Sequence, residues 1–351
     1  MANPKTNALR EYLKKEKLDA VILFNQDPNF KYFAEQEFEH GLMVLTRKAN
    51  YFFISPLHSV KFPGFKIIRW KKFKPEFKAF IKKNRIRRVG AAYDNMFLRE
   101  KRFLSKHAKT RDASKFLYQL RQVKDKTEIA KLRKAVSITD KIFDGMLAGL
   151  KSRKFKTEKD IAFFIKTEAL KAGAEMSFEP IVASGGNGIV AHHVPESKLR
   201  RGFMVLDFGA RYQGYHADMT RTVYLGDPSA AERAIYDKLL SVQRACIEKA
   251  CAGVNAASLF RYAVKLLGDD AKYFNHGLGH GIGVEIHEAP SLSLKSKDVL
   301  KEGSVFTIEP GYYNKKTGVG IRIEDDVYLG KGGRKEVLTK STKELLRVRF
   351  K

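Results

Sequence analysis

The sequence predicts an α+β protein of two domains, a smaller one over residues 1–118 and a larger one over residues 119–351. Its 351 residues are many for one domain and comfortable for two. Hydrophobic residues make up 44% of the chain, which is enough for a sizeable core. After residue 118, the order of strand-like and helix-like patterns favours packed layers of helices and sheets over a doubly wound sheet.

The first 116 residues have the pattern of a small α/β unit. An amphipathic stretch rich in Lys and Leu predicts a helix, and apolar runs on both sides of a polar turn predict paired strands. Helices are expected over residues 7–18 and 77–83, and strands over 20–24, 42–45, 51–54, 65–70 and 89–93. No cluster of potential ligands or nucleophiles occurs here, so we interpret this part as scaffold or as the wall of a pocket.

The larger domain opens with apolar residues at helical spacing. Helices are expected over 120–150, 157–172 and 230–250, and strands over 204–208, 218–224, 305–308 and 321–328. Two strand-turn-strand segments, 204–224 and 305–328, each have one acidic residue on either side of a polar turn. Such repetition indicates a duplicated half-domain.

The chain is strongly basic, with a formal net charge of +28. Residues 61–90 contain twelve Lys or Arg and one acidic residue, Glu76. This excess could form a patch for nucleic acid or an anionic surface. No aromatic-basic motif or recognised DNA-reading module accompanies it, so we interpret the charge as a solvated surface and expect no nucleic-acid partner.

The sequence gives no indication of a signal peptide, a membrane span or a disulfide framework. The N-terminus has charges and no apolar core of a signal peptide, and no apolar run approaches the roughly 20 residues of a membrane span. Cys246 and Cys251 lie in a helix-like stretch at a spacing that would not place them on one helix face. We therefore expect no membrane contact, no disulfide framework and a reducing, cytoplasmic location.

The first acidic pair is Asp207 and Asp218. Asp207 lies in an apolar, β-prone run, where an unpaired buried carboxylate is costly. If the intervening turn centres between Tyr212 and Gln213, Asp207 and Asp218 face each other directly, with Cβ atoms about 4.5–5.5 Å apart. Two like charges at that separation repel, and a divalent cation would relieve the repulsion.

The second acidic pair is Glu309 and Glu324. Glu309 ends an apolar strand before Pro-Gly, and Glu324 follows the strand-like run 321–323. The turn over 314–318 would bring the two carboxylates into register. Four acidic residues at strand positions, two in each hairpin, therefore predict a cation site.

Histidines in a glycine-rich stretch supply a further ligand type. His276, His280 and His287 occur in NHGLGHGIGVEIHEAP, whose glycines allow close approach of the backbone. One imidazole with four carboxylates suits a pair of divalent ions better than a structural zinc, which prefers Cys and His. Two ions about 3.5–4 Å apart can hold a hydroxide and polarise a carbonyl, so the residues predict metal-assisted hydrolysis.

The motifs LDFGA, HADMTRT, HGLGHGIGVEIHE, TIEPGYY and IRIEDD resemble those of the methionine aminopeptidase–creatinase superfamily. Their order and spacing are similar to the Xaa-Pro dipeptidase and aminopeptidase P branch. The resemblance covers residues 118–350, and the first 116 residues are similar in length and pattern to the creatinase-like N-terminal domain of that branch. It implies a pita-bread catalytic domain after a smaller α/β domain.

The resemblance also implies a metal-ligand set of five residues. Asp207 would chelate one ion, Asp218 and Glu324 would bridge both, and His280 and Glu309 would complete the second site. Two divalent ions per subunit are expected, Mn²⁺ or Co²⁺ first, with Zn²⁺ or Fe²⁺ as alternatives.

Catalytic roles are implied in the same way. Glu309 is similar to the residue that accepts a proton from the bridging water, and His287 to the histidine that stabilises the substrate carbonyl or its oxyanion. His192 resembles the substrate-facing histidine, with the adjacent His193 as an alternative. Arg322 resembles an outer partner of the bridging carboxylates or a substrate contact.

The activity implied is hydrolysis of the Xaa-Pro bond of dipeptides by a metal-bridging hydroxide. In dipeptidases of this group the N-terminal domain of one subunit closes the partner's pocket, so a cap formed by the loop 27–40 and a homodimer are expected. Two alternatives remain: an aminopeptidase P acting on longer peptides, and a nucleic-acid-binding protein on a peptidase-like fold.

Overall fold

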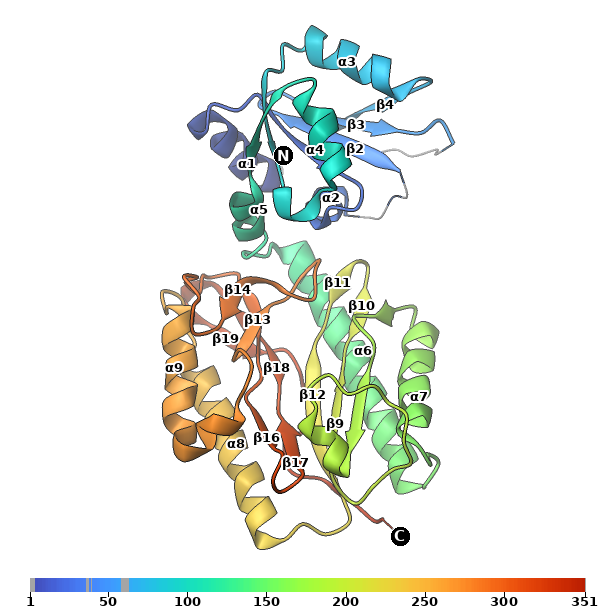
Figure 1. The fold of residues 1–351 in the computed structure, drawn as a ribbon, viewed down its shortest axis with the longest axis vertical. Helices are drawn as coiled ribbons and strands as arrows, with labels where there is room; N and C mark the ends of the chain where they lie inside the picture. Colours follow the sequence, from blue (N-terminus) through green and yellow to red (C-terminus); the bar gives the residue numbers. More distant parts are fainter. Residues whose placement is uncertain (1–3, 36–37, 39, 58–62, 351) are drawn as a thin grey trace. The chain divides into compact units, whose positions relative to one another are not determined.

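The computed structural model describes residues 4–35, 38, 40–57 and 63–350, which fall into two units, Met1–Arg121 and Gln122–Lys351. Helices and strands are mixed in both units (Figure 1), so the predicted α+β class is confirmed. Among the described residues, no helix has both the length and the hydropathy that a membrane crossing requires.

The first unit is built on one six-stranded sheet with the order β4-β3-β2-β1-β5-β6. Strands β1, β2 and β3 pair antiparallel, and the other neighbours pair parallel. The strands are β1 Ala20–Phe24, β2 Gly41–Thr46, β3 Asn50–Ile54, β4 Phe65–Arg69, β5 Arg88–Ala91 and β6 Lys109–Asp112. The helices are α1 Pro4–Lys15, α2 Pro28–Ala34, α3 Phe73–Lys83, α4 Leu98–Ser105 and α5 Ser114–Leu120, and the short 3₁₀ turn η1 is Tyr93–Asn95.

The sequence predicted a cap loop over residues 27–40. This prediction is wrong for the first half of the stretch, because α2 occupies it. Asp27 explains the helix: its side chain accepts a hydrogen bond from the Asn29 amide, and Pro28 follows at the start of the helix. Residues 36, 37 and 39 of the same stretch lie outside the described residues.

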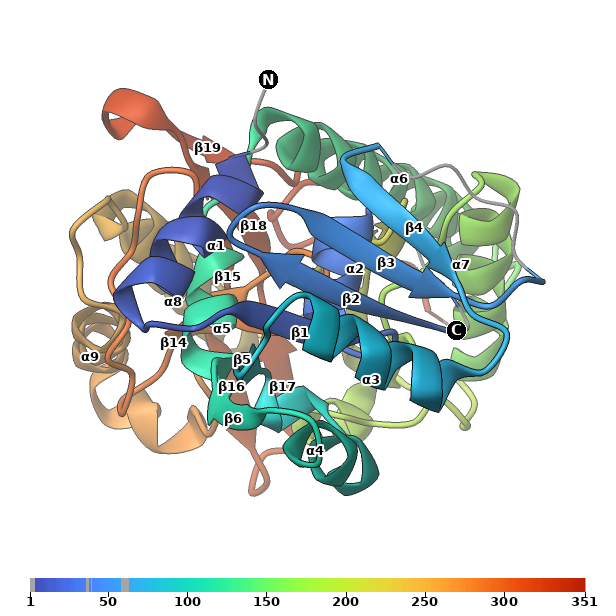
Figure 2. The ribbon, with the colours of Figure 1, turned by 90° about the horizontal axis from the view of Figure 1, so that it is seen from above.

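The second unit has two pairs of helices around its strands. Figures 1 and 2 both show α6 and α7 on one side of the strands and α8 and α9 on the other. Each pair packs on a separate apolar core, which agrees with the two half-domains that the sequence indicated. The helices are α6 Lys126–Lys151, α7 Glu158–Lys171, α8 Ala230–Lys249 and α9 Ala256–Leu267, and the 3₁₀ turns are η2 Gly185–Ile189, η3 Gly268–Tyr273 and η4 Lys331–Gly333.

The strands of this unit form several small sheets, of which the largest has the order β14-β13-β15-β18-β19 and the next β20-β12-β9-β8. The strands are β7 Glu175–Met176, β8 Ile181–Ser184, β9 Gly202–Phe208, β10 Ala210–Tyr212, β11 Tyr215–His216, β12 Met219–Leu225, β13 Gly279–Gly281, β14 Glu288–Leu292, β15 Val305–Ile308, β16 Gly311–Asn314, β17 Val319–Arg322, β18 Asp325–Leu329, β19 Lys335–Val337 and β20 Arg347–Val348.

The long helix α6 begins at Lys126, six residues after the predicted start at 120. A capping box sets this start: the Asp125 side chain accepts from the amides of Thr127 and Glu128, and the Glu128 side chain accepts from the Asp125 amide. The preceding apolar residues belong to α5 instead.

The register of the first acidic hairpin differs from the prediction. Asp207 pairs with Thr220, and Asp218 lies two residues further along. The turn centres between Gln213 and Gly214, one residue later than expected, because both residues adopt positive φ and form the tight turn. A displacement of two residues leaves Asp218 on the same face as Asp207, diagonally across the ladder.

The second acidic hairpin has the predicted register. Ile308 pairs with Asp325 and Gly311 pairs with Arg322, so Glu309 and Glu324 occupy matching positions between the two ladders. The strand predicted over 321–328 is interrupted there and forms β17 and β18.

Both cysteines are free thiols. Cys246 is buried in α8, and burial raises its pKa to about 12. Cys251 is exposed just beyond the end of that helix.

Candidate active site

A cavity of about 470 Å³ lies in the second unit, and both acidic hairpins contribute to its wall. Every residue predicted for the site lines it: His192, Asp207, Asp218, His280, His287, Glu309, Arg322 and Glu324. The apolar part of the wall includes Phe178, Ile181 and Ile286. The structure therefore gathers residues from segments more than 100 positions apart in the sequence.

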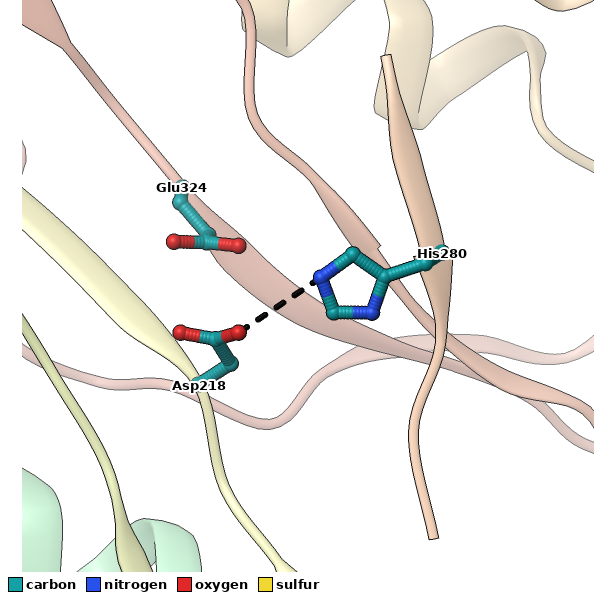
Figure 3. Close-up of side chains that lie close together, drawn as sticks. All are labelled: Asp218, His280 and Glu324. Atoms are coloured by element: carbon teal, nitrogen blue, oxygen red, sulfur yellow. Dashed lines mark ion pairs between the residues drawn. The ribbon is translucent and has the colours of Figure 1, made fainter. Parts of the chain in front are cut away.

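Three ligand-type side chains that line the cavity lie close together (Figure 3). One ligand atom each from Asp218, His280 and Glu324 lies within 4.8 Å of the others. The Nε2 atom of His280, on β13, is 3.5 Å from Asp218 Oδ2 and 3.5 Å from Glu309 Oε1. Of the three candidate histidines, His280 is the one within 3.5 Å of two carboxylates, while His276 Nδ1 lies 3.8 Å from Glu309 Oε2.

The carboxyl groups of this cluster lie close to one another in an environment that disfavours their charged form. Burial raises the pKa of Asp218 and of Glu324 well above the usual range, and neighbouring carboxylates raise both further. Burial likewise raises the pKa of Glu309 to about 8, against the opposing charge of Arg322. Burial also lowers the pKa of His280 to about 3, which keeps its imidazole neutral and able to bind a cation.

Two carboxylate oxygens without a hydrogen-bond donor also indicate that the cavity suits divalent cations. Asp207 Oδ1 and Asp218 Oδ1 are buried and have no hydrogen-bond partner among the described residues. A buried carboxylate oxygen without a donor is costly, and a cation would satisfy it. Oxygen ligands with a single imidazole suit hard to borderline divalent ions.

Arg322 is fixed by the surrounding protein. Its Nη2 atom is 2.5 Å from Asp207 Oδ2, and Nη1 donates to the Tyr313 hydroxyl at 2.6 Å. Its Nε atom donates to Thr220 Oγ1 at 3.0 Å, and that hydroxyl donates to Glu324 at 2.7 Å. This arrangement matches the outer-partner role more closely than a direct substrate contact.

The structure separates the two adjacent histidines. His192 lines the cavity. His193 turns away and its Nε2 lies 2.8 Å from Glu158 Oε2, whose side chain has 0% exposure. His287 also lines the cavity, with its ring edge-on to that of His280 at 4.2 Å between centroids. His192 is therefore the member of the pair that can face a substrate.

No role was predicted from the sequence for two polar residues at the site, Tyr313 and Thr220. Tyr313 receives a hydrogen bond from Arg322 and lies 3.0 Å from His276 Nε2, while Thr220 joins Arg322 to Glu324. Strand alternation could have identified Thr220, because residues two apart, such as Asp218 and Thr220, share a face.

The comparisons with known proteins identify the class. Residues 130–331 match the model of metallopeptidase family M24, and residues 5–123 match that of the creatinase/prolidase N-terminal domain. The chain belongs to metallopeptidase family M24, with the pita-bread fold in its larger unit. The family implies divalent metal cofactors. The resemblance inferred from the motifs is confirmed.

Individual relatives narrow the comparison. The chain is 32% identical to the Xaa-Pro dipeptidase of Pyrococcus horikoshii over 98% of this chain and 99% of that protein. The solved structure of an Xaa-Pro dipeptidase from Bacillus anthracis superposes with a TM-score of 0.91 and 30% identity, covering 98% of this chain and 99% of that one. An X-Pro aminopeptidase from Thermotoga maritima superposes with a TM-score of 0.85 and 29% identity, covering 95% and 98%.

Proposed function

We propose that the protein hydrolyses the Xaa-Pro bond of dipeptides with divalent metal ions as cofactors. The observation that supports this most is the convergence of Asp218, His280 and Glu324 at the wall of a cavity that is also lined by the buried Asp207 and the partly buried Glu309. The similarity to Xaa-Pro dipeptidases of two organisms supports the substrate class.

The residues that would hold the ions are Asp207, Asp218, His280, Glu309 and Glu324, as the resemblance implied. When bound, divalent ions lower the pKa of water and polarise a carbonyl group. Mn²⁺ and Co²⁺ are the first expectation and Zn²⁺ and Fe²⁺ the alternatives, because carboxylates and one imidazole suit all four.

Other side chains of the cavity act on the peptide and its protons. Glu309 accepts a proton at its carboxylate from the attacking water and returns it to the nitrogen of the leaving proline. His287 donates a hydrogen bond to the substrate carbonyl oxygen as negative charge develops there. His192 contacts the substrate, and the apolar wall of Phe178 and Ile286 provides a surface for the pyrrolidine ring.

The second candidate is an aminopeptidase P, which removes the residue before proline from longer peptides. The similarity to the X-Pro aminopeptidase of Thermotoga maritima supports it. The nucleic-acid-binding alternative is disfavoured by the full set of ligand-type residues in the cavity. The homodimer and the cytoplasmic location stay predictions.

Substrate length separates the two enzymatic candidates. We expect hydrolysis of Ala-Pro in the presence of Mn²⁺ or Co²⁺, slower turnover of Ala-Pro-Ala, and no turnover after chelation. Ala-Ala serves as the control for proline specificity. Faster cleavage of the tripeptide would favour the aminopeptidase, and no cleavage of either peptide with any of the four metals would reject both.

A further inference from the structure

Glu158 is a buried acidic residue outside the cavity wall. It is the first residue of α7, and its side chain has 0% exposure. The helix does not need this carboxylate for its cap, because Thr157 and Asp160 already form a capping box there. A buried charge is costly unless it is well hydrogen-bonded, so its role lies in the groups it contacts.

The hydrogen bonds that the Glu158 carboxylate accepts all come from one stretch of chain, residues 184–197, which we call the His192 segment. Oε1 accepts from the Ser184 amide at 2.7 Å, the Ser184 hydroxyl at 2.8 Å and Asn187 Nδ2 at 2.9 Å. Oε2 accepts from His193 Nε2 at 2.8 Å. These hydrogen bonds lower the pKa of Glu158 to about 2 although burial opposes them, so the carboxylate is ionised.

The His192 segment has little regular structure of its own. After η2 it runs as irregular backbone, and its far end is attached to the start of α7 by one main-chain hydrogen bond, from the Glu158 amide to the Ser197 carbonyl oxygen at 2.9 Å. Asn187 donates to Ser197 as well as to Glu158, which ties the two ends of the segment together. The Glu158 carboxylate therefore holds the near end and the middle of the segment.

The His192 segment also contacts the second acidic hairpin, at Gly320 and Arg322. A Cβ atom on Gly320 of β17 would lie 1.9 Å from the Gly188 carbonyl oxygen, so only glycine permits this close approach. The Arg322 guanidinium also lies 3.4 Å from the Ala191 carbonyl oxygen. His192, between Ala191 and the Glu158-bound His193, is thus fixed from both sides at the cavity wall.

We propose that Glu158 is a positioning residue for substrate recognition, which acts through the His192 segment to hold His192 at the cavity. This inference rests on the proposed function and deepens it. Glu158 reaches no substrate itself. It determines how tightly His192 is held in the geometry that contacts the dipeptide.

The main test is Glu158→Gln in the full-length protein, because the amide has the same shape and only one acceptor oxygen for the donors that converge on it. With Ala-Pro we expect KM to rise about tenfold and kcat to change less than about threefold. Glu128→Gln is the matched control. Glu128 is another buried glutamate in the first turn of a helix, and it accepts a hydrogen bond from the Tyr215 hydroxyl. It does not line the cavity, so the KM of Glu128→Gln should equal that of wild type.

A double-mutant cycle shows whether Glu158 acts through His192. If it does, Glu158→Gln added to His192→Ala raises KM no further than His192→Ala alone. Fully additive effects, or an unchanged KM in Glu158→Gln, would overturn the inference. If Glu158→Gln fails to fold, Asn187→Ala decides, since it removes one donor to Glu158 and the tie to Ser197, and it should raise KM about threefold.

A readout independent of activity distinguishes failure of this inference from failure of the proposed function. Amide hydrogen exchange over residues 188–195 should be about tenfold faster in Glu158→Gln and unchanged in Glu128→Gln. Faster exchange in a protein that cleaves no Xaa-Pro peptide would reject the proposed function and leave the role of Glu158 in place. Normal exchange in an active Glu158→Gln variant would overturn that role.

Discussion

Glu324 and Asp325 are neighbours in the sequence, but their carboxylates lie in two different clusters. Glu324 belongs to the cavity cluster, with Asp218 and His280. Asp325 belongs to a second cluster behind the cavity, which we call the rear cluster. Its carboxylate accepts hydrogen bonds from Arg221 at 2.8 Å, Lys343 at 2.5 Å, Thr339 at 2.5 Å and Gln243 at 2.8 Å.

The two carboxylates are buried to the same degree and have opposite pKa shifts. Burial and the charge of Glu309 raise the pKa of Glu324 well above the usual range. Burial would also raise the pKa of Asp325, but the charges of Arg221 and Lys343 lower it to about 2. The protein supplies two counter-charges to Asp325, whereas at the cavity Arg322 pairs with Asp207, and among the described residues no Lys or Arg forms an ion pair with Asp218 or Glu324. This difference separates a structural acid from a functional one.

The largest expected effect follows from removing a charge from the cavity cluster. Glu324→Gln should lower kcat/KM for Ala-Pro more than about 1000-fold, roughly 4 kcal/mol, because one of the residues proposed to hold the ions would lose its charge. The same variant should unfold at a higher temperature than wild type in the presence of a chelator, since repulsion within the cluster falls. Hydrolysis rates with metal measure the loss of activity, and thermal melts in chelator measure the change in stability. A melting temperature of Glu324→Gln below that of wild type in chelator would contradict the proposed difference between the two clusters.

Removing the charge of the rear cluster should have the opposite effect on stability. Asp325→Asn leaves the buried Arg221 and the partly buried Lys343 without their counter-charge, and we expect a loss of about 3 kcal/mol in the free energy of unfolding. Urea denaturation measures it. The control is Asp237→Asn, which breaks a half-exposed pair with Arg233 and should cost less than about 0.5 kcal/mol.

The smallest effect concerns a third buried carboxylate, Glu158. Its pKa is about 2 in the folded protein, below the ordinary 4.5, so its ionised form stabilises the fold above pH 4.5 and this contribution is lost as the pH falls towards 2. The difference in unfolding free energy between wild type and Glu158→Gln should therefore narrow by about 2 kcal/mol between pH 6 and pH 3. Urea titrations at stepped pH measure it, and a constant difference would show that the charge of Glu158 contributes nothing.

Much of the fold could be predicted from local pattern. The strands Ala20–Phe24 and Val305–Ile308 have the predicted bounds because each is an apolar run between polar residues. The start of α6 was wrong because apolar spacing continues through α5, whereas the capping box at Asp125 ends that continuity. Capping chemistry decided this boundary against the periodicity.

The residues expected at the site all line one cavity, while their geometry could not be predicted from the sequence. An aspartate in an apolar strand, such as Asp207, indicates a partner without identifying it, and the partner is Arg322, 115 positions away. The turn of the first hairpin was predicted one residue too early, because a positive φ at Gln213 is not evident from its residue type. Glu158 had no local signal, since the partners of its carboxylate are 26 to 39 positions away.

The contrast between the two thiols has a practical consequence. These are the only cysteines in the chain, and one of them, Cys246, is sealed in α8 while Cys251 is open to solvent. A thiol-reactive fluorophore should therefore attach at a single position in the native enzyme, with no engineering of the sequence. Such a singly tagged protein would allow the association of two chains to be followed by dilution, which is the measurement that the predicted homodimer needs.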